Sequence, residues 1–155
     1  MTAFDTDVIT LILNGSEYYV KKAERISPAE LSLPVPVFEE VIRGRLNAIR
    51  QAESGRVKMT VAAAYEMLRE TAENLRRYGL LPFDAQGETL TADWTKQRIK
   101  VGTMDMRIGA SCIIGNATLV SRNRRDFDRL PGLRVEYWDH AAKPAADPAN
   151  GKETE

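Results

Sequence analysis

The chain has 155 residues, of which 43% are hydrophobic and 28% charged, and its 22 Lys and Arg side chains balance 22 Asp and Glu. This length fits one domain with one hydrophobic core, and this composition excludes an intrinsically disordered chain. Because the formal net charge is +0, an argument for nucleic-acid binding has to come from local clusters of basic residues.

The chain contains a single cysteine, Cys112, and a single histidine, His140. An internal disulfide is therefore excluded, and so are the usual zinc sites built from several histidines. Any metal ion would have to be held mainly by oxygen. The opening residues leave no room for a secretory signal, and no apolar run approaches the roughly 20 residues that cross a bilayer. We therefore expect a cytoplasmic protein without a membrane span.

The first quarter of the chain predicts a strand that runs directly into a helix. A short apolar strand ends at Asp5, and the helix that follows is closed by Asn14 and Gly15. A second short helix is expected over 17–26. Residues 31–37 are interrupted by prolines and predict a brief strand or sheet-edge segment.

Helical periodicity dominates the rest of the chain. We predict helices over 38–52, 61–78, 84–98 and 104–114, and short strands over 80–83, 117–120 and 133–138. Strands that alternate with helices predict an α/β fold, here a three-layer α/β/α sandwich with a mostly parallel central sheet. We expect residues 1–140 to form this domain and residues 141–155, rich in Ala, Pro, Asp and Lys, to form a disordered tail.

Four carboxylates lie at the ends of predicted elements. Asp5 and Asp126 each follow a strand, and Glu40 and Asp105 each open a helix. All four can therefore converge at one rim of the sheet. Parallel sheets bind ligands at this rim, beyond the carboxyl ends of their strands. Converging carboxylates repel each other and take up protons unless a cation neutralises them, and oxygen-only sites suit Mg²⁺ or Mn²⁺. Two such ions can activate water for phosphodiester hydrolysis without a histidine base. Each acid taken alone is explained equally well as a helix cap or as a charge that favours a helix N-terminus.

Four segments of the chain carry a resemblance to a known family. These segments are 4–9, 38–46, 102–110 and 119–127. In chain order, they resemble the four motifs of the PIN-domain family, and in particular those of the VapC-type toxin ribonucleases of type II toxin–antitoxin systems. The resemblance covers residues 2–139. It implies that the family's acidic metal ligands correspond to Asp5, Glu40, Asp105 and Asp126.

Within these motifs, Glu40 rather than Glu39 fits the family pattern, because it precedes Gly44 by four positions. Gly109 stands where an alanine is usual, which is expected to loosen that helix without removing a ligand. Ser121 replaces the more common threonine and keeps the hydroxyl group. The resemblance implies an endoribonuclease that uses Mg²⁺ or Mn²⁺ to hydrolyse RNA, a small antitoxin protein that covers the acidic groove, and a homodimer.

Basic residues surround the fourth carboxylate. Arg122, Arg124 and Arg125 are candidates for binding RNA phosphates, and the alternative is a solvated face with local ion pairs. Asn123 is a candidate for positioning a phosphate or the attacking water, or it caps the turn after the strand. Asp7 is a candidate for a water-mediated role at the metal site, or it serves the start of the helix.

Other features admit more ordinary explanations. The helix over 61–75 has an apolar face that suits a second copy of the chain, a partner peptide or core packing. Trp94, Trp138 and Cys112 are expected in or near the core. Two rival functions remain open: a PIN-like module that binds RNA or protein without catalysis, and a structure-specific DNA nuclease. The compact chain, without an inserted arch or clamp, makes the DNA nuclease the weaker rival.

Overall fold

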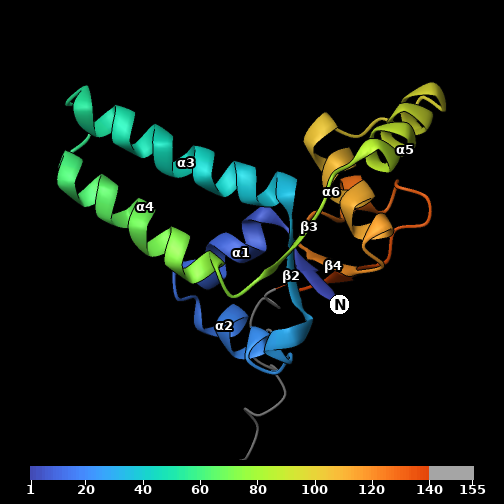
Figure 1. Cartoon of the computed structure of the whole chain (residues 1–155), viewed down its shortest axis with the longest axis horizontal. Coiled ribbons are helices and arrows are strands. Elements are labelled where there is room, and N and C mark those ends of the chain that lie inside the picture. Colours follow the sequence, from blue (N-terminus) through green and yellow to red (C-terminus); the bar gives the residue numbers. More distant parts are fainter. Residues whose placement is uncertain (140–155) are drawn as a thin grey trace, which may run out of the picture.

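Five short parallel strands form the centre of the computed structural model, which describes residues 1–139 (Figure 1). The strands lie in the order β3-β2-β1-β4-β5, and each neighbouring pair is parallel. Their bounds are β1 (Thr2–Phe4), β2 (Leu31–Pro34), β3 (Gly79–Leu81), β4 (Thr118–Ser121) and β5 (Val135–Tyr137). The predicted α/β class with a parallel sheet is therefore confirmed. His140 and the predicted tail over 141–155 lie outside the described residues.

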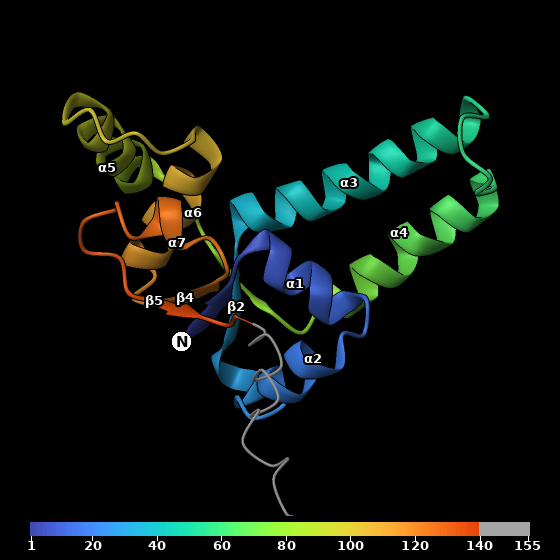
Figure 2. The same ribbon diagram turned by 180° about the vertical axis from the view of Figure 1, so that it is seen from behind.

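Helices flank the sheet on both sides, as the right-handed crossovers of parallel strands require (Figures 1 and 2). On one side lie α1 (Thr6–Leu13) and α2 (Glu17–Ala23), and on the other α5 (Ala85–Lys96), α6 (Thr103–Ile114) and the short α7 (Arg124–Phe127). A 3₁₀ turn, η1 (Pro28–Glu30), precedes β2. The long helices α3 (Val35–Glu53) and α4 (Val61–Leu75) lie side by side and project from the sheet, and we call this pair the α3–α4 arm.

Two boundaries near the prolines differ from the prediction. Helix α3 begins at Val35, three residues earlier than expected, because Pro36 lies in its first turn, where a helix does not use the missing N–H. Of the two alternatives for this segment, the brief strand is confirmed and the sheet-edge position is wrong, because β2 is an inner strand between β3 and β1. Pro34 is tolerated there because it is the last residue of the strand.

The other predicted elements are present with shifted ends. Helix α2 ends at Ala23 rather than at residue 26, and α4 ends at Leu75 rather than at residue 78. Gly79 starts β3 instead of ending a helix. The polar run over 121–126 contains the start of α7, a helix that the sequence did not predict. Asp84 caps α5 as expected, since its side chain accepts the backbone N–H of Gln86 at 3.0 Å.

The core is apolar and closely packed. Trp94 and Trp138 are each 2% exposed and Cys112 is fully buried, as predicted. At Gly109 an added Cβ would lie 2.6 Å from Cδ1 of Leu130, which is itself buried. Glycine therefore lets α6 approach the chain around Leu130 closely, which is a packing reason for the departure from alanine.

Candidate active site

Two neighbouring central strands end side by side and bring Asp5 next to Ser121. Phe4 is paired with Val120, and the backbone N–H of Asp5 donates to the Val120 carbonyl at 2.9 Å. The Ser121 hydroxyl donates to Oδ2 of Asp5 at 2.7 Å. Asp5 is only 6% exposed, so this carboxylate is fixed inside the rim of the sheet.

Thr6 links Asp5 to Glu40. Its backbone N–H donates to Oδ1 of Asp5 at 2.7 Å, which makes Asp5 the N-cap of α1. Its hydroxyl donates to Oε2 of Glu40, 34 residues away in the sequence. Glu40 lies in the second turn of α3 rather than in the first, because the helix begins at Val35. It nevertheless reaches the rim of the sheet, as the prediction required.

Asn123 links the other two carboxylates. Its side-chain amide donates to Oδ2 of Asp126 at 3.0 Å and, more weakly, to Oδ2 of Asp105 at 3.4 Å. Its Oδ1 caps α7 by accepting the backbone N–H of Asp126, and its own backbone N–H donates to Ser121 Oγ at 3.0 Å. One asparagine thus joins α6, α7 and the end of β4.

A pocket of about 490 Å³ collects most of these groups. We call it the carboxylate pocket; it is lined by Asp5, Thr6, Asp7, Thr10, Leu11, Glu40, Asp105, Arg122 and Asn123. Three of the four predicted carboxylates therefore line one cavity. Asp126 borders it, within hydrogen-bond reach of Asn123 and close enough to raise the pKa of Asp105.

Both inner carboxylates are difficult to ionise. Burial, followed by the negative charges of Asp7 and Asp105, raises the pKa of Asp5 to about 7, although the hydrogen bonds from Ser121 and Thr6 oppose this shift. Burial, followed by the charges of Asp126, Glu40 and Asp7, raises the pKa of Asp105 to about 6. Carboxylates with pKa values raised by burial and by neighbouring negative charges would be favoured in their ionised form by a cation bound beside them.

The donor set fits a hard divalent cation. All acidic groups present are carboxylates, and Oδ1 of Asp7 is buried without a hydrogen-bond partner among the described residues. Such an oxygen is costly to leave unpaired and is available to an ion or to water bound to it. Within residues 1–139, no three His, Cys, Asp or Glu side chains are already grouped to hold a metal ion. Joint ligation by three carboxylates therefore requires side-chain movement.

The predicted substrate-binding arginines lie in different places. Arg122 lines the carboxylate pocket, together with Asn123. Arg124 instead forms an ion pair with Asp139 at 2.9 Å, and its guanidinium lies 4.2 Å from the ring centre of Tyr137. Arg125 is exposed and does not line this pocket.

The sequence did not predict Thr6 as a residue of the site. For Ser121, it indicated only that the hydroxyl group of the usual threonine is kept. The signal for Ser121 was available, because a polar residue directly after an apolar strand lies at the same rim as Asp5. The contact of Thr6 with Glu40 depends on how α3 packs against α1, which local patterns do not specify.

Known proteins resemble this chain in sequence and in fold. A family model described as the PIN domain matches residues 3–133. The chain belongs to the PIN-domain family. One curated relative of this PIN domain, Ribonuclease VapC2 of Rickettsia felis, is 34% identical over 70 residues, which cover 42% of this chain and 52% of the relative. The matched part of the PIN domain thus spans about half the length of that relative.

Solved structures share the fold of this PIN domain. The structure of VapBC2 from Rickettsia felis bound to a DNA fragment from their promoter contains a chain with a TM-score of 0.69 and 20% identity, and the match covers 89% of this chain and 98% of that one. A chain of the DNA-bound VapBC from Salmonella typhimurium has the same TM-score and identity, with coverages of 90% and 100%. Within residues 1–139, no helix is long and apolar enough to span a membrane.

Proposed function

We propose that this protein is a metal-dependent endoribonuclease that hydrolyses RNA phosphodiester bonds, with Asp5, Glu40, Asp105 and Asp126 as its catalytic metal ligands and Mg²⁺ or Mn²⁺ as its cofactor. The observation that carries the proposal is the shared pocket in which Asp5 and Asp105 have pKa values of about 7 and about 6. Burial, followed by repulsion between carboxylates, raises both pKa values, and a divalent cation would favour the ionised forms. A relative named as a ribonuclease, 34% identical over 70 residues, supports RNA as the substrate.

When bound, such ions lower the pKa of a water molecule and neutralise charge that builds up on the phosphate. The chain's own residues prepare the site for this chemistry. Ser121 and Thr6 hold the two oxygens of Asp5 in place, and Thr6 also holds Glu40. Asn123 orients Asp105 and Asp126, since it contacts an oxygen of each. Arg122, on the wall of the pocket, supplies a positive charge for the phosphate.

The same proposal includes a protein partner. The solved structures named above are of VapBC2 and VapBC, and a further structure that shares the fold is a toxin–antitoxin complex from Klebsiella pneumoniae. We propose that this chain is the toxin of such a pair, that a cognate antitoxin covers the carboxylate pocket, and that the chain forms a homodimer. A cytoplasmic location stays a prediction.

The decisive experiment incubates purified protein with a labelled RNA pool and Mn²⁺ or Mg²⁺, next to an EDTA control and the Asp5→Asn variant. We expect cleavage that requires the metal and is lost in the variant. Matched DNA substrates test the DNA-nuclease alternative. Folded protein that binds the metal and RNA but cuts neither RNA nor DNA would contradict the proposal and favour the binding module.

A further inference from the structure

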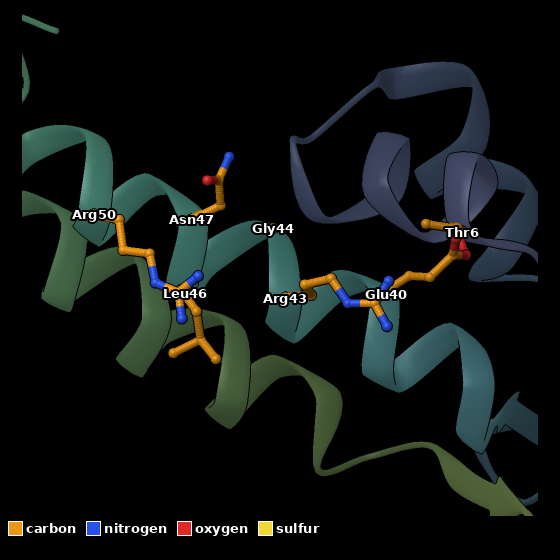
Figure 3. Close-up of a pocket in the computed structure, with 7 residues that line it drawn as sticks. All are labelled: Thr6, Glu40, Arg43, Gly44, Leu46, Asn47 and Arg50. Carbon is orange, nitrogen blue, oxygen red and sulfur yellow. The ribbon is translucent and has the colours of Figure 1, made fainter. Parts of the chain in front are cut away.

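A second cavity opens along α3, beside the carboxylate pocket. It has a volume of about 500 Å³, and because Thr6 and Glu40 line both cavities, the two adjoin each other. The remaining lining residues come from one stretch of α3, and we call this part the α3 groove; they are Arg43, Gly44, Leu46, Asn47 and Arg50. Figure 3 shows Glu40 reaching Thr6 at one end, with Asn47 and Arg50 at the other.

The α3 groove offers hydrogen-bond donors in a row. Arg43, Asn47 and Arg50 are spaced by four and three residues, the spacing of neighbours on a helix surface, and the two arginines are roughly 10 Å apart along the axis. Arg43 pairs with the exposed Glu39, and surface pairs of this kind are weak enough to be exchanged for another anion. Among the described residues, Arg50 has no carboxylate partner.

Two further residues leave room for an apolar group. A Cβ at Gly44 would have no heavy atom within 4 Å, so the floor of the groove is open at this point. Leu46 is 44% exposed although it is a large apolar side chain. Cations, an amide and an apolar surface in one groove match a nucleotide, which combines an anionic phosphate, hydrogen-bonding base edges and an apolar base face.

We propose that the α3 groove binds the part of a single-stranded RNA that adjoins the bond to be cut. Arg43 and Arg50 hold phosphates, Asn47 contacts a base edge, and Leu46 lies against a base. Because Thr6 and Glu40 line both cavities, this RNA segment would lie next to the carboxylate pocket. The inference rests on the proposed ribonuclease function and adds to it the residues that bind the substrate beside the cleaved bond. A single strand suits contacts with bases, because its base edges are accessible in a way that those of a duplex are not.

The test measures binding of a fluorescent single-stranded RNA by anisotropy at several salt concentrations. All chains carry Asp5→Asn to prevent cleavage. We expect R43Q/R50Q to bind about tenfold more weakly, because hydrogen bonds from charged donors are lost. The slope of log K against log salt should shrink by roughly 1.4, since each phosphate contact to a single strand contributes about 0.7. R43K/R50K, which keeps both charges, should retain most of the slope.

Two controls separate charge loss and misfolding from loss of the groove. R25Q/K96Q removes two exposed cations that do not line the groove and should leave affinity and slope close to the parent values. Gly44→Leu adds an apolar side chain to the groove without changing charge, and its Cβ would have no heavy atom within 4 Å. It should therefore fold like its parent, which the thermal unfolding midpoint checks, and should weaken RNA binding.

The outcomes also separate this inference from the proposed function. If the chain with an intact Asp5 cleaves RNA while R43Q/R50Q keeps the affinity and slope of its parent, the α3 groove is not an RNA site and only this inference fails. If R43Q/R50Q loses binding of a partner protein instead, the groove is a protein site and the inference also fails. If the chain neither binds nor cleaves RNA, both proposals fail together.

Discussion

The carboxylate pocket and the α3–α4 arm hold their polar groups by different means. Around Asp5, the side chains are buried and fixed by hydrogen bonds to the ends of central strands. Along the arm, most polar groups are exposed, and several form ion pairs within one helix, such as that of Arg43 with Glu39. The buried region suits chemistry that needs fixed geometry, whereas the exposed arm can exchange its ion pairs for a ligand.

The largest effect is expected at the centre of the buried region. Asp5→Asn should lower metal-dependent cleavage by at least roughly 100-fold, because even residues that only support metal ligands cost 10- to 100-fold when changed. Asp105→Asn should behave in the same way. The measurement is cleavage of labelled RNA over a range of Mn²⁺ concentrations, with circular dichroism to confirm folding. A folded double variant that still cleaves would show that the ligands lie elsewhere.

The stability of the metal-free protein should fall as the pH rises. Folding raises the pKa of Asp5 from 3.8 to about 7, so the folded state binds more protons between these values, and its free energy of unfolding decreases as the pH rises through that window. Asp105, with a pKa of about 6, acts in the same direction. Each pKa unit corresponds to about 1.4 kcal/mol, so the loss is on the order of a few kcal/mol.

Urea unfolding in EDTA at pH 5 and pH 7.5 measures this loss. Asp5→Asn should show a much smaller pH dependence, and added Mg²⁺ should restore stability at the higher pH, since ion binding favours the folded state. A parent protein that is equally stable or more stable at pH 7.5 in EDTA would contradict the raised pKa values.

A smaller effect is expected at Ser121, which supports Asp5 by a hydrogen bond. Ser121→Ala removes the hydroxyl that donates to Asp5 and accepts the Asn123 N–H, so the apparent metal affinity should fall by about 10- to 100-fold. Ser121→Thr keeps the hydroxyl and should retain most of that affinity. Titration of cleavage with Mn²⁺ compares the two variants, and equal behaviour of alanine and threonine would rule out this role of the hydroxyl.

The smallest effect is expected in the arm. Arg45 donates to the buried hydroxyl of Thr71 at 2.8 Å and thereby joins α3 to α4. Thr71→Val should lower the free energy of unfolding by about 1 kcal/mol and leave cleavage of a short RNA unchanged. Urea unfolding and cleavage are measured side by side. A loss of cleavage beyond what the lower stability explains would mean that the arm also positions the carboxylates.

The carboxylate pocket and the arm also differ in how far the sequence alone could predict them. Asp5 follows an apolar strand and caps a helix, so its location could be derived from its neighbours alone. The start of the arm could not be predicted in this way, because Val35 and Pro36 show no helical periodicity. Helix α3 nevertheless includes both residues, since the first turn of a helix tolerates proline.

Contacts between distant segments were the other part that sequence patterns missed. The hydrogen bond from Thr6 to Glu40 and the position of Arg124 against Asp139 and Tyr137 both depend on tertiary packing. The motifs predicted which carboxylates converge on one rim. They did not predict that Asp126 stays at the border of the pocket, where Asn123 holds it.

The pairing of β1 with β4 has a consequence for synthesis of the chain. Asp5 is synthesised 116 residues before Ser121, the serine that fixes it. Contacts of such long sequence separation form late, after the intervening segments are available. The pocket around Asp5 therefore cannot form until β4 has been synthesised and has left the ribosome. The nuclease that we propose is thus inactive until translation of its mRNA has passed the codons for β4.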